Sequence, residues 1–484
     1  MSAAADPAVV SNLVASGARG GSLPWWLPFT PRWSVVIPAE WLMAVLAFAG
    51  VGAGLTAVAR GARPSSRLLV TGAFLIVAAL AVLPPAGSKD ALNYAVYGRI
   101  AVLGHSPYVM TAQQLIRTGD PIGRAARHLW QHQASTYGPL ATAEQWAAAE
   151  LGGISIARIT FWLKLWNALA FLAVVLALDR IFRSNPALRA RAHLLWSVNP
   201  FALWGVVAAG HIDGIGAALG FAGVAALSVR RPGERPDDQH ALAAGFLIGA
   251  AAAIKVTFAL YGIGVAWAAM TTRRLAAVGP FALAGFLAFL APAYLLAGRP
   301  AVVVLLRRST MFNWGNLYEL LYRPLGYSAP PPDMQVVAYI TFAAVALLAL
   351  WRLPAGFPDR PFVRPALAIT LAWLFTWPYH YLWYDVAGLC LLVLYPATLL
   401  DWAVLLRLLA AALVSLPGGP TGHIISRAEL AAVGNLVAPL ANLAAVLILV
   451  CMCLPGPRRR FAAPGQAGAL IPPAEPAASA PQRR

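Results

Sequence analysis

Long apolar runs separated by short polar segments make up most of the chain. Many of these runs reach the roughly 17 residues that a helix needs to cross about 30 Å of hydrocarbon. An alternating pattern of about ten residues, typical of transmembrane β-strands, does not occur in the sequence. Because a helix satisfies its backbone hydrogen bonds internally, the pattern predicts an all-α fold, a polytopic bundle of transmembrane helices.

The apolar pattern predicts about 13 spans. Two of them, at 241–254 and 256–270, are short and meet at Lys255. Short or broken helices that meet at an ionisable residue are a recognised way of building a site inside a membrane. The other spans are expected near 39–58, 68–83, 159–178, 192–209, 212–228, 275–297, 335–351, 365–378, 382–400, 402–416 and 429–453.

The same pattern divides the chain into three parts. Residues 1–38 form an N-terminal segment whose prolines and tryptophans suit a membrane interface. Residues 39–455 form the transmembrane domain, in which 87–158 is the first large loop between spans. Residues 456–484 form a tail rich in proline and alanine, which we expect to be disordered.

Composition supports the membrane interpretation. Of the 484 residues, 60% are apolar and 11% are charged, whereas soluble domains average about 25% charged residues. The net charge of +18 does not indicate a nucleic-acid partner, because the arginines stand in short clusters between spans. Such clusters act as topology signals and contact anionic lipids. The three cysteines lie in apolar runs without the spacing of a metal or disulfide site.

The arginine clusters also predict the orientation of the chain. With about 13 spans, every cluster falls on one side, which the positive-inside rule assigns to the cytoplasm. Loop 87–158 then lies on the extracytoplasmic face of the plasma membrane, and the active site is expected there too. Five separate polar clusters share that face: Asp90, His211 with Asp213, Lys255, Arg307 with Arg308, and His380 with Asp385.

Asp90 is the first candidate for catalysis, because it opens a polar stretch directly after the second span. In a helix, Asn93, Tyr94 and Tyr97 fall on the same face as Asp90. The guanidinium of Arg99 is the last polar group of this stretch. The carboxylate can accept a proton from a hydroxyl group or fix a cation; alternatively, Asp90 caps the start of a helix.

Two further sets of polar residues follow along the chain. Tyr108 and Tyr137, each near a glycine and a proline, carry rings that can stack on a sugar or cap a helix. His211 and Asp213 can bind a metal, move protons, or form hydrogen bonds to a diphosphate or a sugar. A third metal ligand with matching spacing is missing, so no metal site is predicted. The alternative is a polar helix end that water satisfies.

Three further clusters contain charged groups, and two of them also contain aromatic rings. Lys255 ends an apolar run, so it either pairs with an acid such as Asp213 or binds an anionic ligand. Arg307 and Arg308 precede a segment with Trp314, which suits either a phosphate beside an apolar chain or a contact with lipid headgroups. The third cluster, 377–385, is an aromatic belt or the wall of a lipid groove, with His380 and Trp383 as its candidate residues.

The order of these motifs resembles a known family. An acid after the second span is followed by Tyr-x-x-Tyr-Gly-Arg, Gly-x-x-Pro-Tyr, Tyr-Gly-Pro-Leu, Asn-Pro and His-x-Asp. This series is similar to the GT-C class of integral-membrane glycosyltransferases that use polyprenyl-phosphate sugars. Within that class it most resembles actinobacterial polyprenol-phosphate-mannose-dependent α-(1→6)-mannosyltransferases, over roughly residues 68–400. The resemblance implies that the first large extracytoplasmic loop carries the catalytic acid, here Asp90, and that the sugar carbon is inverted.

The chain departs from the family pattern at two places. Ile212 stands where the family often has an Asn, and no second acid adjoins Asp90 to form a metal-binding pair. We therefore predict no cofactor, and the residues give no support for a divalent cation.

Together, the residues and the resemblance predict a hexosyltransferase that moves a sugar, by the resemblance mannose, from a polyprenyl phosphate to a cell-envelope glycan or lipoglycan. Its partners are then this donor, the acceptor and the lipid bilayer, without nucleic acid. Asp90 accepts the proton of the acceptor hydroxyl, and Lys255 with Arg307 or Arg308 balances the leaving phosphate. The alternatives are a polyprenyl-phosphate arabinofuranosyltransferase, a lipid-linked sugar transporter or flippase, and an assembly subunit.

Overall fold

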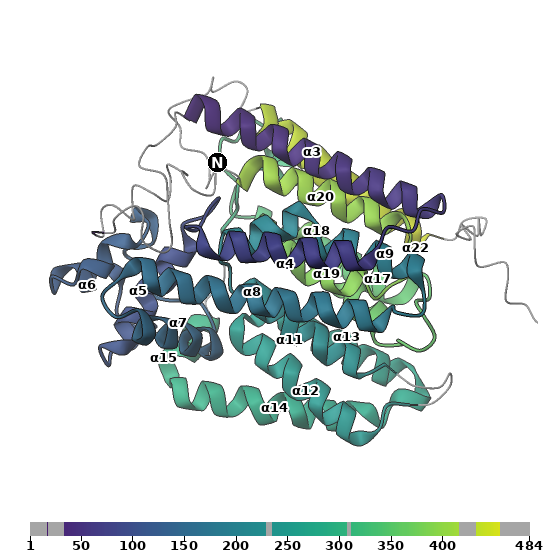
Figure 1. Ribbon diagram of the computed structural model, residues 1–484, viewed down its shortest axis with the longest axis horizontal. Helices are drawn as coiled ribbons and strands as arrows, with labels where there is room; N and C mark the ends of the chain where they lie inside the picture. Colours follow the sequence, from purple (N-terminus) through teal and green to yellow (C-terminus); the bar gives the residue numbers. More distant parts are fainter. Residues whose placement is uncertain (1–16, 18–32, 229–234, 307–310, 416–431, 455–484) are drawn as a thin grey trace, which may run out of the picture.

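The computed structural model describes residues 17, 33–228, 235–306, 311–415 and 432–454. Within these ranges every regular element is a helix, which confirms the all-α prediction. Figure 1 shows a bundle in which the long helices lie side by side along broadly one direction. Most of the N-terminal segment and all of the C-terminal tail lie outside the described residues, so the division into three parts stays a prediction.

Five helices in the described residues are long and apolar enough to cross a membrane. A sixth candidate is a pair of helical segments, Pro186–Ala208 and Asp213–Ala226, joined at a bend of 118°. These helices fit a membrane protein, whereas the count of about 13 crossings stays a prediction. The five are α3 (Trp33–Ala59), α8 (Ile156–Ile181), α14 (Val278–Ala297), α17 (Met334–Arg352) and the continuous pair η8 (Val433–Val437) and α22 (Ala438–Cys453).

Most of the shorter helices also follow the ranges expected from the apolar pattern. They pack between the long helices, and their buried apolar side chains form the main core of the bundle. They are α4 (Ser66–Val82), α11 (Asp213–Ala226), α12 (Asp238–Ile254), α13 (Ala259–Thr271), α18 (Val363–Thr376), α19 (Val386–Leu392) and α20 (Leu399–Ser415).

The stretch predicted as one span at 192–209 is interrupted. Pro200 has no N–H group to donate to the preceding turn, so the helix breaks before it and starts again. π-helical turns, which often occur at functional sites, lie on both sides of this break. The segments are α9 (Pro186–Ala192), η3 (His193–Ser197), α10 (Pro200–Ala202) and η4 (Leu203–Ala208).

The stretch predicted as one span at 382–400 is shorter than expected. A 3₁₀ turn, η7 (Leu382–Asp385), leads into α19, which ends at Leu392. Pro396 follows, and the residue before a proline avoids the helical region of backbone conformation. The next helix, α20, therefore begins only at Leu399.

Close packing between α12 and α14 depends on glycine. A Cβ atom added at Gly245 would lie 1.9 Å from the carbonyl oxygen of Ala282, and one at Gly285 would lie 2.0 Å from that of Leu242. Backbones approach this closely only where side chains are absent. Small residues of this kind allow helices to associate in lipid, where the hydrophobic effect gives no driving force.

Loop 87–158 folds into a helical layer at one end of the bundle (Figure 1). Its main helices, α5 (Asp90–Val102) and α7 (Pro139–Gly152), pack against each other and against α8. Their apolar side chains form a core distinct from that of the bundle. The shorter elements of the loop are α6 (Ala112–Arg117), η1 (Pro121–Ala125) and η2 (His128–Trp130).

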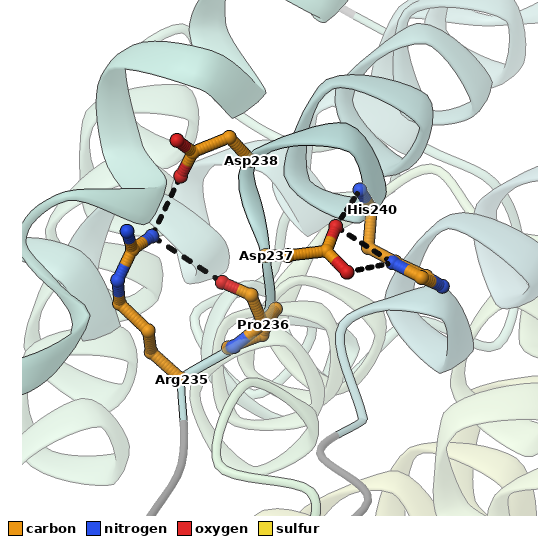
Figure 2. Close-up of polar contacts among 5 residues, drawn as sticks. All are labelled: Arg235, Pro236, Asp237, Asp238 and His240. Atoms are coloured by element: carbon orange, nitrogen blue, oxygen red, sulfur yellow. Dashed lines mark hydrogen bonds and ion pairs between the residues drawn. The ribbon is translucent and has the colours of Figure 1, made fainter.

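A small polar network fixes the start of α12 (Figure 2). Asp237 accepts a hydrogen bond from the backbone N–H of His240 at 2.8 Å and lies 2.8 Å from Nδ1 of the same residue. Arg235 forms an ion pair with Asp238 at 2.6 Å. The carboxylate of Asp237, the N-cap residue, satisfies a free N–H group of the first helical turn. The other end of α12 leads directly to Lys255.

Candidate active site

Two breaks in the helices place polar residues close together. The first is the bend of 118° before α11, where Gly210 has a φ of 70°, a value that favours glycine, and is followed by His211 and Asp213. The second follows α12, where Lys255 is extended before the 3₁₀ turn η5 (Val256–Phe258). The predicted meeting of two short helices at Lys255 is confirmed.

An ion pair joins these two breaks. Nζ of Lys255 lies 2.9 Å from Oδ1 of Asp213 and 3.4 Å from the centre of the Tyr384 ring, which adds a cation–π contact. Of the two partners that the sequence left open for Lys255, the acid is present. The side chain of Lys255 is 15% exposed and that of Asp213 is 4% exposed, so the ammonium group is the open side of the pair.

Asp90 is the first residue of α5, and its carboxylate lies beside His211. Oγ of Ser88 accepts a hydrogen bond from the backbone N–H of Asp90 at 3.2 Å. Oδ2 of Asp90 lies 3.8 Å from Nδ1 of His211, and the Asp90 side chain is 20% exposed. The hydroxyl oxygen of Tyr94, one turn further along α5, lies 3.1 Å from the same nitrogen. Asp90 and Tyr94 lie on one face of α5, as their spacing predicted, and the fold brings both to the imidazole of His211.

Aromatic rings surround His211. Its ring stacks on Trp383 with the centroids 3.7 Å apart, and Trp383 stacks on Tyr381 at 4.6 Å. Tyr137 contacts Tyr94 edge to face at 5.0 Å. Ring faces beside a small number of polar groups are typical of small-molecule sites. The aromatic stretch 377–385 therefore forms a wall of the candidate site.

The charge state of Asp90 depends on burial and on two cations. Burial raises the pKa of Asp90 from 3.8 to about 6, and the positive charges of Arg127 and Lys255 partly oppose this rise. A carboxylate with this pKa is ionised at neutral pH and is a stronger base than an exposed carboxylate. Such a group is suited to general base catalysis.

The sequence did not identify Arg127, whose charge opposes the rise in the Asp90 pKa more than any other. Its backbone N–H donates to Oδ1 of Asn93 at 3.0 Å, so the residue is tied to the face of α5 that carries Asp90. One arginine in a polar loop gives no distinctive signal. Tyr381 and Tyr384 were also missed, although the aromatic stretch that contains them was recognised.

The Tyr137–Leu140 motif holds the loop against the break at Lys255. The backbone N–H of Gly138 donates to the carbonyl oxygen of Ile254 at 2.9 Å. A Cβ atom at Gly138 would lie 2.1 Å from the carbonyl oxygen of Ala253, so only glycine allows this approach. Pro139 then occupies the first turn of α7, where its missing N–H costs nothing. The motif therefore joins α7 to the Lys255 break and places Tyr137 beside Tyr94.

The comparison with known families identifies this chain. A family model described as "Alpha-(1->6)-mannopyranosyltransferase, N-terminal domain" matches residues 9–271, which is more than half of the chain. The chain belongs to this family. It is an α-mannosyltransferase, as the resemblance in its motifs implied, and the matched region carries Asp90, His211, Asp213 and Lys255. A search of curated proteins found no match.

Three predicted binding residues of the mannosyltransferase make contacts inside loop 87–158. The hydroxyl of Tyr97 donates to a loop carbonyl at 3.4 Å. Arg99 forms an ion pair with Asp120 at 2.8 Å, and the Tyr108 hydroxyl lies 2.8 Å from Oγ1 of Thr142. These side chains hold the loop together, and substrate contacts for them stay a prediction.

The remaining predicted residues of the mannosyltransferase lie in its C-terminal part. His380 is buried, with Nδ1 3.0 Å from the carbonyl oxygen of Trp377, and its backbone N–H donates to Asn313. Trp314 donates from Nε1 to Asn435 at 2.8 Å and packs in a small core of its own. Substrate contacts for His380 and Trp314 also stay a prediction. The predicted phosphate-binding residues Arg307 and Arg308 lie outside the described residues.

Proposed function

We propose that the enzyme transfers mannose from a polyprenyl phosphate to a cell-envelope glycan or lipoglycan on the extracytoplasmic face of the plasma membrane. The observation that carries this proposal is the partly exposed Asp90 carboxylate under the influence of Arg127 and Lys255. A base beside two cations suits a reaction that removes a proton from a hydroxyl group and releases a phosphate.

In the proposed step, the oxygen of the acceptor hydroxyl forms a bond to the anomeric carbon of mannose. The bond from that carbon to the phosphate oxygen breaks, and its electron pair leaves with the polyprenyl phosphate. Asp90 takes the hydroxyl proton. Attack on the side opposite the leaving group inverts the carbon, as the family resemblance implies. Lys255 and Arg127 balance the charge that develops on the phosphate, and Arg307 and Arg308 remain candidates for the same role.

Lys255 can bind a phosphate without leaving Asp213. An ammonium group has three N–H donors, and the ion pair at 2.9 Å uses one of them. The side chain also keeps an open side. Arg127 adds a planar guanidinium, which matches two phosphate oxygens at once. Aromatic rings such as Trp383 are proposed to contact the sugars and the isoprenoid chain.

The arrangement of the bundle supports the proposed orientation. α9, which carries Arg189 and Arg191, lies at the end opposite to α5, α6 and α7 (Figure 1). Basic clusters favour the cytoplasmic side. The test places one cysteine at exposed His132 in the loop or at exposed His240 at the start of α12. We expect an impermeant thiol reagent to label only His132→Cys in intact cells, with the native protein as the background control. Labelling of His240→Cys alone would overturn the orientation.

The activity is tested with purified enzyme, a short mannoside acceptor and three labelled donors. We expect product from mannosyl polyprenyl phosphate and none from a nucleotide-linked mannose. Product from arabinofuranosyl polyprenyl phosphate alone would support the arabinofuranosyltransferase alternative. Movement of the donor across vesicles without any transfer would support the flippase.

We propose that transfer requires no metal ion or other cofactor. The prediction rests on the absence of a second acid next to Asp90 in the sequence. Turnover is expected to stay within about twofold when a chelator such as EDTA is added, because cations of the protein balance the phosphate. A large loss that Mg²⁺ or Mn²⁺ restores contradicts this proposal.

A further inference from the structure

We propose that Lys164, a buried residue of α8, is a positioning residue that holds the start of α5 and the turn before His211 together. Its side chain is 0% exposed. A buried ammonium group is costly inside a membrane bundle unless hydrogen bonds satisfy it. Lys164 has such partners, and they belong to the segment that leads into Asp90.

The ammonium group of Lys164 binds the end of α4. Nζ donates to the carbonyl oxygens of Leu80 at 2.7 Å, Leu83 at 2.5 Å and Pro84 at 3.2 Å. In a continuing helix, the carbonyl of Leu80 would accept from the backbone N–H four residues later. That residue is Pro84, which has no N–H, so the sequence itself leaves this carbonyl without its usual partner. The backbone N–H of Leu83 approaches this carbonyl at 3.3 Å, and Lys164 adds a shorter bond at 2.7 Å.

The alkyl stem of Lys164 packs against the turn before His211. A Cβ atom at Gly210 would lie 2.9 Å from Cγ of Lys164 and 3.4 Å from Cβ of Ala91, the residue after Asp90. The turn therefore lies between the Lys164 stem and the first turn of α5. A backbone hydrogen bond of 3.1 Å from Ala86 to Ala208 joins the same two segments.

This clamp acts on the distance between Asp90 and His211. One segment runs from the carbonyl groups that Lys164 binds to Asp90, and the other runs from Gly210 to His211. The side chains of Asp90 and His211 are 3.8 Å apart. The inference rests on the proposed role of Asp90 as the base. A misplacement of about 1 Å at a reacting group can reduce the rate about 100-fold. Lys164 touches neither reacting group, so it acts by positioning.

The test compares Lys164→Met, Lys164→Gln and Lys164→Arg in the full-length enzyme. Methionine keeps an apolar stem without donors, whereas glutamine and arginine keep donors. Thr160→Val is the matched control, because Thr160 is buried on the same helix and its hydroxyl bonds only to carbonyls of α8. The measurements are single-turnover rate, donor KM, the pH profile and the unfolding temperature.

We expect Lys164→Met to lose about 10- to 100-fold in turnover, with donor KM changed less than about threefold. Loosening the clamp hydrates Asp90, so the acid limb of the pH profile should move to lower pH. Lys164→Arg or Lys164→Gln should recover part of the rate, and Thr160→Val should keep it.

Two outcomes overturn the proposal. The first is a folded Lys164→Met enzyme, or a folded Lys164→Leu enzyme if the first does not fold, with turnover within about twofold of Thr160→Val. The second is a loss of turnover in the Lys164 variants that parallels their loss in unfolding temperature, while the acid limb of the pH profile does not move. Normal turnover in Asp90→Asn would instead contradict the proposed function, because it would show that Asp90 is not the base. It would not test the contacts of Lys164.

Discussion

The Asp213–Lys255 and Asp385–Arg407 ion pairs both join distant segments at 2.9 Å, but only the first has an open side. Lys255 is 15% exposed, whereas Asp385 and Arg407 are both 0% exposed. Lys255 also faces the Tyr384 ring in the wall of the site. A charge with an open side can meet a ligand, whereas a sealed charge can act only on its protein neighbours.

The sealed pair belongs to a network that holds the C-terminal helices. Arg407 of α20 donates to Oδ1 of Asn442 of α22 at 2.9 Å, and Asn442 donates to the carbonyl oxygen of Gly315 at 2.9 Å. Asp385 ends η7, the turn that carries Trp383. The sealed pair therefore holds the turn that carries Trp383, whereas the open pair contacts the Tyr384 ring. An acid–base ion pair is therefore structural at Asp385–Arg407, whereas we propose that the pair at Asp213–Lys255 takes part in the reaction.

The largest effect is expected at the sealed pair. Arg407→Met leaves the Asp385 carboxylate buried without its cation, which typically costs about 3–5 kcal/mol in the free energy of unfolding. The measurement is unfolding of the purified enzyme in detergent. The control is the double variant Asp385→Asn/Arg407→Met, which removes both charges and should recover much of the loss. A single variant as stable as the native enzyme would show that the pair does not hold the wall.

The next largest effect is expected at Asp90. Asn has nearly the same shape but takes up no proton at neutral pH, so Asp90→Asn should reduce single-turnover transfer by about 100-fold or more. This corresponds to about 2.7 kcal/mol of transition-state stabilisation. Donor binding and the unfolding temperature should stay close to native values. Unchanged turnover would remove Asp90 from the mechanism.

Lys255→Met tests whether the open pair binds the donor. We expect kcat/KM for the donor to fall roughly 30-fold, about 2 kcal/mol, as for the loss of a hydrogen bond between charged groups. Lys255→Arg, which keeps the charge, is the control and should retain part of the activity. Near-normal donor use in Lys255→Met would place the phosphate at Arg127, Arg307 or Arg308, and the open pair would then be structural like the sealed one.

The pH dependence follows from the raised pKa of Asp90, about 6. The proposed base acts when ionised, so kcat/KM should be level above this pKa and fall about tenfold per pH unit below it. At pH 5 the expected loss is therefore about tenfold. Asp90→Asn should lose this acid limb while it keeps any other limb. A limb that is unchanged in Asp90→Asn belongs to another group.

The sequence predicted features that depend on local pattern. Apolar runs placed the long helices and most of the shorter apolar ones, because burial in lipid requires long apolar stretches whatever the packing. The break at Lys255 was predictable because an ammonium group interrupts two apolar runs. The helical spacing of Asp90 and Tyr94 correctly placed them on one face of α5.

The sequence could not predict features that depend on tertiary contact. The bend before α11 arises only when separate segments meet. The sequence named Asp213 as one candidate partner of Lys255, and the fold supplies that contact. Arg127 acts on Asp90 only after the later part of loop 87–158 packs against α5. The ion pair between Arg99 and Asp120 likewise forms only when the loop folds, and a substrate contact for Arg99 stays a prediction.

The smallest predicted effect compares two tyrosines on α5 that differ in their partners. The Tyr94 hydroxyl lies 3.1 Å from Nδ1 of His211, whereas that of Tyr97 donates to a loop carbonyl at 3.4 Å. Tyr94→Phe removes a hydrogen bond at the site, worth about 0.5–1.5 kcal/mol, so turnover should fall about 2- to 10-fold. Tyr97→Phe is the matched control and should change turnover less than twofold. Equal losses in both variants would mean that the packing of loop 87–158 as a whole sets the rate. The contact between Tyr94 and His211 would then have no separate effect on turnover.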